Sequence, residues 1–383
     1  MSKELAYKPF GQLLSRVIDN RGRTCPTSES GMPLIATNCV KNETLYPVYE
    51  KVRFISDDVY ENWFRGHPEP GDMIFVTKGT PGRVCWVPEP VGFCIAQDMV
   101  AIRANEKEVY PKYLFAALRS KTIQDEIENL HVGSLIPHFK KGDFNDLKIP
   151  IPNAEQQKFI GDFYFTLSLK IDLLHRQNKT LEALAETLFR QWFVEEAEES
   201  WETFTLDSFF PVVTGKKDAN YATDNGEYPF FTCSQRISFC DGFSFDGHAI
   251  LLAGNGDFNL KRYKGKFEAY QRTYVLIPFE EKFIGFLFAL MKYFLRDITS
   301  SAQGSVISFL TKGMITDYKI RLPKNKELLN ERLRVFNEFD EKVDFNLEQI
   351  RKLTKLRDTL LPKLMSGEVR VKIDEAETAI AGQ

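Results

Sequence analysis

The side chains of this 383-residue chain that could do chemistry lie in glycine-rich turns, and their pattern favours binding over catalysis. The sequence contains no GxxxxGK(S/T) phosphate loop, no HExxH helix and no GxSxG elbow, and it has no Asn/Asp-Pro-Pro-aromatic tetrapeptide of the kind that grips an extruded base. Residues 79–82 and 254–256 are rich in glycine, but neither segment opens a helix with a phosphate-binding pattern, so both are more typical of hairpin turns. We therefore expect a non-catalytic chain.

The cysteines do not have the spacing of a metal site. They are scattered, with no CxxC pair and no histidine at ligand spacing: Cys25, Cys39, Cys85, Cys94, Cys233 and Cys240. We expect reduced, mostly buried thiols and no metal on this chain. A zinc site assembled from residues that are distant in sequence is the alternative.

Polar and basic loop residues in both halves of the chain could contact nucleic acid. Arginine can bind guanine through two hydrogen bonds, asparagine or glutamine can bind adenine, and lysine more often meets phosphate. The candidates in the first half are Thr77, Lys78, Arg83, Gln97, His138, Lys140 and Lys141. Those in the second half are Gln235, Arg236, Asn255, Asn259, Lys261, Arg262, Lys264 and Arg272. An ordinary solvated surface explains most of them equally well, whereas segment 259–266 also interleaves basic with aromatic residues.

Composition and charge describe a folded protein that does not coat nucleic acid non-specifically. The chain is 43% apolar and 27% charged, with a formal net charge of −3. The first ten residues lack a secretory signal, and the longest apolar run, 283–295, is interrupted by Lys292 and is too short to span a membrane. We expect a cytoplasmic protein in which local patches, or a partner, supply the positive charge.

The second half of the chain repeats the first. Segment 133–152 aligns without a gap on 304–323, and upstream 113–116 matches 286–289 and 71–75 matches 247–251. Each copy starts with short strands (33–40, 73–77, 84–87 and 99–103; then 228–233, 249–253 and 274–277) and continues with a helix (111–130; 283–298). The chain is thus predicted to contain two divergent copies of one module.

A long helical pattern follows each module. Apolar residues at heptad spacing predict a coiled-coil core of Ile160, Leu167, Leu174, Leu181 and Leu188 in the first helix and Val343, Leu347, Ile350, Leu353 and Leu360 in the second. Because the first helix must run from module one to module two and the second must return, the helices should be antiparallel. A helix of about 40 residues would hold two heads roughly 60 Å apart, which suits the recognition of two unlike half-sites on one DNA duplex.

These patterns define the expected fold class and boundaries. We predict an α+β protein with two similar α/β globular domains and two long antiparallel helices forming a coiled coil, related by an internal pseudo-two-fold repeat. The segments are 1–153 (first domain), 154–202 (central helix), 203–323 (second domain), 324–370 (C-terminal helix) and 371–383 (flexible tail).

The chain resembles the specificity (S) subunits of type I restriction-modification enzymes over nearly its whole length. Three stretches carry the resemblance: 133–138 followed by 147–152 and Glu155-Gln156-Gln157, the helix at 178–193, and the ending 356–369. The second copy departs from the pattern, with Ser308 and Phe309 where Pro137 and His138 stand and Asn-Lys-Glu at 325–327.

The resemblance implies a DNA-binding subunit that recognises a bipartite, asymmetric site. Its implied partners are double-stranded DNA, two methyltransferase (modification) subunits and ATP-dependent restriction subunits, and no membrane. S-adenosylmethionine, ATP and Mg are expected on those partners and no cofactor on this chain. Outward-facing Phe189, Trp192 and Phe193 are candidates for docking the methyltransferase, with core packing as the alternative.

Two other classes of protein remain open at this point. A stand-alone nuclease or methyltransferase with scattered catalytic residues would show activity as an isolated chain. A coiled-coil scaffold would fail to bind DNA even with its partners present.

Overall fold

The computed structural model describes residues 6–369 except 21, 23, 131–136, 225 and 301–308. The predicted tail 371–383 and the repeat segments 133–136 and 304–308 lie outside the described residues. The chain forms two compact units, Met1–His175 with Glu348–Gln383 (unit 1) and Arg176–Leu347 (unit 2). The predicted domain boundaries lie where the long helices begin. The boundaries of the two compact units instead lie in the middle of both long helices, because the two halves of each helix pack in different units.

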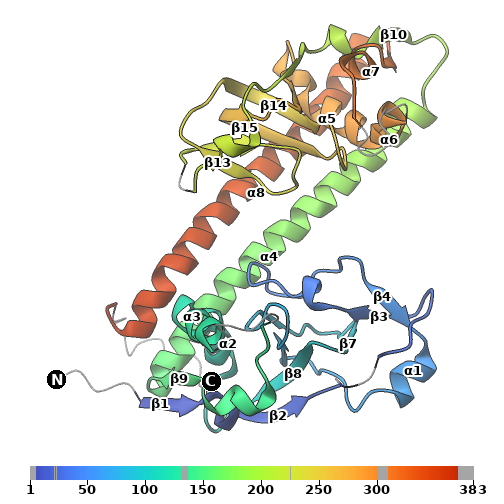
Figure 1. The fold of residues 1–383 in the computed structure, drawn as a ribbon. Helices are drawn as coiled ribbons and strands as arrows, with labels where there is room; N and C mark the ends of the chain where they lie inside the picture. The colour runs from blue at the N-terminus through green and yellow to red at the C-terminus, as the bar shows by residue number, and fades with distance from the viewer. Residues whose placement is uncertain are drawn as a thin grey trace, which may run out of the picture. The chain divides into compact units, whose positions relative to one another are not determined.

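Unit 1 holds two small sheets beside a pair of short helices (Figure 1). The first sheet has the order β2-β8-β5-β6, the second β4-β3-β7, and β1 pairs separately with β9. The strands are β1 Ala6–Pro9, β2 Leu14–Ile18, β3 Met32–Ile35, β4 Arg53–Ile55, β5 Met73–Val76, β6 Val84–Trp86, β7 Cys94–Ile95, β8 Met99–Ala104 and β9 Lys148–Ile151, with α1 at Asp57–Asn62. Strands β5 and β8 are buried on both faces, with alternate side chains in two core clusters, one of which also contains residues of α2 and α3.

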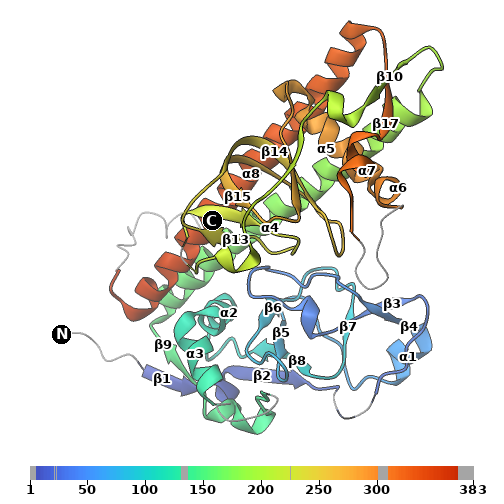
Figure 2. The same ribbon diagram turned by 45° about the horizontal axis from the view of Figure 1, so that its top comes forward.

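Unit 2 repeats this topology. Its strand order β11-β16-β14-β15 corresponds to β2-β8-β5-β6, β12 pairs antiparallel with β13 and parallel with β15 as β3 does with β4 and β7, and β10 pairs with β17 as β1 does with β9. The strands are β10 Glu202–Thr205, β11 Val212–Thr214, β12 Tyr228–Phe231, β13 Ser238–Cys240, β14 Phe245–Ala253, β15 Leu260–Ala269, β16 Thr273–Leu276 and β17 Lys319–Leu322. One long strand, β15, occupies the positions of both β6 and β7, because it pairs with β14 as β6 does with β5 and with β12 as β7 does with β3 (Figure 2). The repeat seen in the sequence is therefore confirmed in the fold.

The helix predicted after each set of strands is divided in two. Residues 111–130 form α2 Pro111–Arg119 and α3 Lys121–Asn129, because Ser120 adopts an extended backbone and its hydroxyl accepts a hydrogen bond from the Ile123 N–H as the N-cap of α3. Residues 283–298 form α5 Ile284–Tyr293 and α6 Leu295–Thr299, and α7 spans Lys312–Thr316. None of the helices in the described part of the chain is long and apolar enough to cross a lipid bilayer.

The long helices are α4, Ala154–Arg190, and α8, Lys326–Ser366. In unit 2 the guanidinium of Arg332 donates to the Trp192 carbonyl and the amide of Asn346 donates to Asn178, so residue numbers rise along one helix as they fall along the other. In unit 1 Arg357 likewise reaches Ser168. The helices are therefore antiparallel in each unit, as the sequence predicts.

Among the predicted coiled-coil core residues, Ile160, Leu174, Val343 and Ile350 are buried, and Leu167, Leu181, Leu188, Leu347, Leu353 and Leu360 are half-buried. The same stripe also holds buried polar side chains that the heptad pattern does not reveal: Ser168, Asn178, Asn346 and Arg357. The Asn346 Nδ2 donates to Asn178 Oδ1 at 2.7 Å and to Gln177 Oε1 at 2.9 Å. A polar pair at such a position favours one helix register over its alternatives.

Replacing Asn346 with alanine is expected to reduce the free energy of unfolding by about 1–3 kcal/mol, because the buried Asn178 Oδ1 loses its donor and the exposed Gln177 loses a partly buried hydrogen bond. Urea denaturation measures this loss, with Glu331→Ala, an exposed change on the same helix, as the control. Equal stability of the two variants would contradict the role assigned to Asn346.

Candidate nucleic-acid interface

An open groove in unit 1 brings together five of the predicted nucleic-acid contacts. Asp19, Gly22, Thr24 and Asp98 line it together with the predicted residues Thr77, Lys78, Gln97, His138 and Lys140. Arg83 and Lys141 do not line this groove; Arg83 is half-buried and Lys141 is exposed at the start of a short 3₁₀ helix. The groove contains hydrogen-bond donors, such as the lysine side chains, and acceptors, such as the aspartate carboxylates. Base edges in the major groove present both donors and acceptors, so they can be recognised by such a set.

Backbone hydrogen bonds hold the turn that presents these groups. The N–H groups of Thr77 and Lys78 donate to the Asp98 carbonyl at 2.8 and 3.2 Å, and the Phe139 N–H donates to the Thr77 carbonyl at 2.7 Å. Gln97 and Asp98 have φ of +54° and +48°, a left-handed conformation that costs energy for residues other than glycine. Thr77 is fully buried at the wall of the groove, where its backbone supports the turn.

The same backbone contacts recur in unit 2 and identify equivalent positions. The Leu310 N–H donates to the Gly254 carbonyl as Phe139 does to Thr77, and the Gly254 N–H donates to the Arg272 carbonyl as Thr77 does to Asp98. The isolated bridge of Lys78 with His138 has its counterpart in Asn255 with Phe309. The equivalent positions hold different residues: Lys78 corresponds to Asn255, His138 to Phe309 and Asp98 to Arg272. The two turns therefore present different side chains.

Several predicted contacts in unit 2 face the protein interior. Asn259 is buried, and its amide donates to the Cys233 carbonyl at 2.8 Å and to Asp257 Oδ1 at 2.6 Å, while Lys261 binds the Asn259 side chain. Asn259 therefore closes the turn between β14 and β15, and its contact with DNA stays a prediction that this buried position does not favour. Gln235, Arg236 and Arg272 are exposed and Asn255 is half-buried, so these side chains can still reach a ligand.

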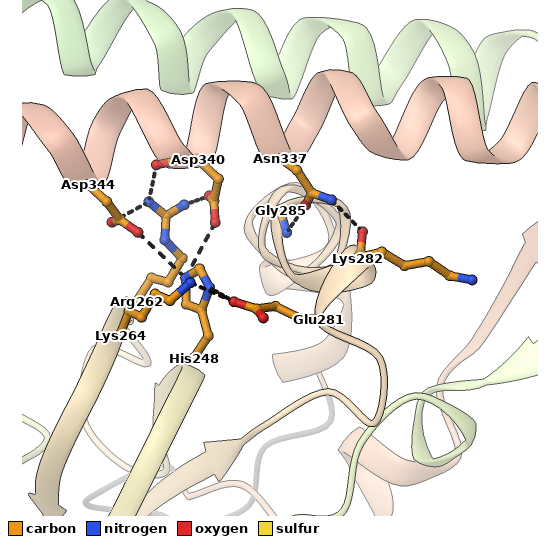
Figure 3. A network of polar contacts seen from close by, with 9 residues as sticks. All are labelled: His248, Arg262, Lys264, Glu281, Lys282, Gly285, Asn337, Asp340 and Asp344. Atoms are coloured by element: carbon orange, nitrogen blue, oxygen red, sulfur yellow. Dashed lines mark hydrogen bonds and ion pairs between the residues drawn. The ribbon is translucent and has the colours of Figure 1, made fainter.

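Arg262 is the second predicted contact in unit 2 whose side chain is buried. Its side chain is 8% exposed and forms ion pairs with Asp340 and, at 2.9 Å, with Asp344 of α8 (Figure 3). Lys264, two residues along β15, remains exposed and pairs with Glu281 at 2.7 Å. Residues 262 and 264 lie on the same face of β15, because side chains alternate along a strand. They differ in burial because Arg262 pairs with carboxylates of α8, whereas Lys264 pairs with the exposed Glu281.

His248 lies next to Arg262 in the same network. Burial lowers the pKa of its imidazole, and the neighbouring charge of Arg262 acts in the same direction, while Asp344 opposes both. The ring is therefore expected to be neutral at pH 7.

The predicted docking residues also belong to the core. Phe189 and Phe193 are 1% and 7% exposed and pack on Phe286 of α5, and half-buried Trp192 packs edge-on against Phe336. Phe189 and Phe193 cannot form an outer surface, so for them the alternative of core packing holds. The apolar residues that are exposed on the long helices are Leu173 and Leu184 of α4 and Phe345 and Leu356 of α8.

The sequence carries a signal for this exposed set. Leu173 and Leu184 are eleven residues apart, about three helical turns, as are Phe345 and Leu356, and each pair shares one helix face. The two pairs are separated by the same offset of 172 residues that relates Lys170-Ile171-Asp172 to Lys342-Val343-Asp344. The repeat thus preserves exposed apolar positions as well as buried ones.

A module that occurs twice, with polar turns of different chemistry and a long helix leaving each copy, defines a protein with two non-identical recognition sites. The chain belongs to the family of the type I restriction modification DNA specificity domain, whose model matches residues 28–183 and again 198–355. It is thus a DNA-recognition chain of the specificity-subunit class and not a catalytic one.

Individual relatives agree with this assignment. The EcoDI specificity subunit of Escherichia coli is 42% identical over 172 residues, which are 44% of this chain and 38% of that protein. The MjaIX specificity subunit of Methanocaldococcus jannaschii is 23% identical over 333 residues, which are 74% of this chain and 76% of that one. The crystal structure of the type I S subunit from M. genitalium has the same fold, with a TM-score of 0.58 at 18% identity over 95% of this chain and 97% of that chain.

Proposed function

We propose that this chain recognises a bipartite, asymmetric DNA site, with one unit for each half, and positions methyltransferase and restriction subunits on it. The observation that carries the proposal is the pair of equivalent turns, at 77–79 and 254–256, in which the same backbone contacts present different side chains. Equivalent frames with unlike side chains suit two unlike half-sites. S-adenosylmethionine, ATP and Mg belong to the partner subunits in this proposal.

Methylation mapping tests the proposal. The chain is co-purified with a candidate methyltransferase subunit, and methylated adenines are sequenced in DNA exposed to the complex. We expect a split motif with two unlike halves, and replacement of 203–323 by the corresponding segment of another specificity subunit should change one half only. A chain that neither joins the methyltransferase nor alters which adenines are modified would favour the scaffold interpretation.

Single changes in the unit 1 groove should separate recognition of phosphate from recognition of bases. Lys78→Ala is expected to weaken binding to all DNA sequences and to reduce the salt slope of the affinity by about 1. Gln97→Asn shortens the side chain while tolerating the left-handed backbone, and should cost about 1–3 kcal/mol at one base pair of one half-site. Affinities of the assembled complex for cognate and singly substituted duplexes measure both effects.

The control for these two variants is Gln12→Ala, an exposed change in the same unit that lies outside the groove. If Lys78→Ala changed the preferred base, or Gln97→Asn weakened all sequences alike, the roles assigned to the two side chains would be wrong.

We further propose that the exposed apolar residues of α4 and α8 dock the methyltransferase subunits. Leu173 and Leu184 are 46% and 42% exposed, and their repeat equivalents Phe345 and Leu356 are 52% and 44% exposed. Equivalent exposed apolar residues on two helices suit two copies of one partner, and burying them would remove apolar surface from water.

Leu184→Ser is expected to leave the fold intact and to weaken methyltransferase binding at least about tenfold, which is the equivalent of 1.4 kcal/mol. Analytical ultracentrifugation of the mixed subunits measures the stoichiometry and affinity, and Thr187→Ser, an exposed change one turn away, is the control. Unchanged assembly of Leu184→Ser would remove this residue from the docking surface.

A further inference from the structure

A compact cluster of ligand-type atoms joins β14 to α8 in unit 2. His248 projects from β14, and Asp340 and Asp344 project from successive turns of α8 toward it (Figure 3). One imidazole nitrogen and one oxygen from each carboxylate lie within 4.8 Å of one another. The i, i+4 spacing of the aspartates places both carboxylates on the helix face that packs against the strand.

The contacts between these groups are too long for hydrogen bonds. His248 Nε2 lies 3.5 Å from Asp340 Oδ2 and 3.7 Å from Asp344 Oδ2, whereas N–H···O bonds are about 2.7–3.2 Å. Within the described part of the chain, His248 Nε2 and Asp340 Oδ2 are buried and have no hydrogen-bond partner. Their side chains are only 10% and 6% exposed, and such burial without a partner is costly.

The 3.5 Å separation of His248 Nε2 and Asp340 Oδ2 matches the edge of a coordination tetrahedron, and the 3.7 Å separation to Asp344 Oδ2 is slightly longer. Zinc binds histidine nitrogen at about 2.0–2.1 Å and carboxylate oxygen at about 2.0–2.2 Å, so ligand atoms around it are separated by about 3.3–3.6 Å. We propose that His248 Nε2, Asp340 Oδ2 and Asp344 Oδ2 bind one Zn²⁺ ion, with water as the fourth ligand. The ion reaches the site from the side of Asp344, whose side chain is 33% exposed.

The surrounding groups have the arrangement of an outer ligand shell. Arg262 binds the other oxygen, Oδ1, of both aspartates, and Glu281 Oε1 lies 3.6 Å from His248 Nδ1, on the side of the ring away from the two aspartates. Partners of this kind fix the orientation of metal ligands. Among the ion-paired residues of this cluster, Arg262 and Lys264 are offset by the two aspartates and Glu281, which leaves one negative charge around a neutral imidazole. Lys282, which Figure 3 also draws, pairs with Glu280 outside the cluster. A divalent cation is electrostatically acceptable there.

Sequence spacing cannot reveal this site, because His248 lies 92 residues before Asp340. The tertiary fold alone brings the strand against the helix. The bound ion would join the second recognition sheet to the long helix, and this role does not depend on which DNA sequence the chain recognises.

Zinc titration of the full-length chain tests the proposal. Protein stripped with a chelator is titrated with ZnCl₂ in a calorimeter, and Co²⁺ is substituted to record its visible spectrum. We expect one Zn²⁺ per chain and tetrahedral Co²⁺ bands without the thiolate charge-transfer band that cysteine ligands would add. His248→Asn and Asp344→Asn should each weaken Zn²⁺ binding at least about tenfold.

Glu348→Gln, which removes an exposed carboxylate one turn beyond Asp344, is the matched control and should bind like the wild type. Asp344→Asn changes a partly exposed position, so it keeps the test valid if His248→Asn does not fold. Equal Zn²⁺ binding by the wild type and Asp344→Asn, or a thiolate band in the Co²⁺ spectrum, would overturn the proposal.

Discussion

Arg262→Met is expected to lower the free energy of unfolding of unit 2 by about 3–5 kcal/mol, measured in the presence of a chelator. The guanidinium is 8% exposed and pairs with Asp340, which is 6% exposed, and with Asp344. Methionine preserves much of the side-chain volume, so the loss comes mainly from carboxylates left buried without their cation. Breaking a buried ion pair on one side only is costly for this reason.

Denaturant titration followed by fluorescence measures this loss, since Trp192 and Trp201 both lie in unit 2. Arg272→Met is the matched control, because Arg272 is exposed on the neighbouring turn and should change stability by less than about 0.5 kcal/mol. If Arg262 contacted DNA instead, its variant would keep wild-type stability and lose DNA affinity. That result would contradict the buried network.

Phe189→Ala is expected to destabilise unit 2 by about 3–5 kcal/mol. The ring is 1% exposed and contacts Phe286, Tyr293 and Phe294 with centroid distances of 5.8, 5.5 and 5.8 Å, so its removal leaves a cavity where α4 meets α5 and α6. Neighbouring rings cannot collapse fully into that space. The midpoint of urea denaturation should fall accordingly.

Leu184→Ala provides the comparison for Phe189→Ala, because Leu184 lies on the same helix but is 42% exposed. It should change stability little. A Phe189→Ala protein that kept its stability but no longer joined the methyltransferase would restore the docking interpretation of this ring.

The sequence revealed the two-fold repetition because glycines, prolines and apolar residues recur with similar spacing in the two copies. Segments such as 73–77 and 99–103 appear as β5 and β8 within a residue or two, since buried β-branched runs leave few alternatives. The antiparallel helices followed from chain connectivity. The break at Ser120 was not anticipated, because a serine within an apolar helical pattern can either continue the helix or cap a new one. The two alternatives differ little in energy, so the sequence does not decide between them.

The candidate site was predicted less well, because the sequence does not show which way each side chain points. Lys78, Gln97, His138 and Lys140 come together in one groove as their loop positions suggested, whereas Asn259 and Arg262 turn inward. A basic residue in a strand looks the same in the sequence whether it meets solvent or a buried carboxylate. Its partner, Asp340, lies 78 residues away in a helix, and no local pattern connects the two.

By itself, the sequence determined the class of this protein: two divergent copies of one module, each followed by a long amphipathic helix, with the family's terminal motif. These features are recorded in spacing and periodicity, which are local properties of the chain. Only the tertiary structure decided which side chains face solvent. It placed Phe189 in a core and Leu184 outside, paired Arg262 with α8, and set His248 beside two aspartates, because such contacts join segments that are far apart in sequence.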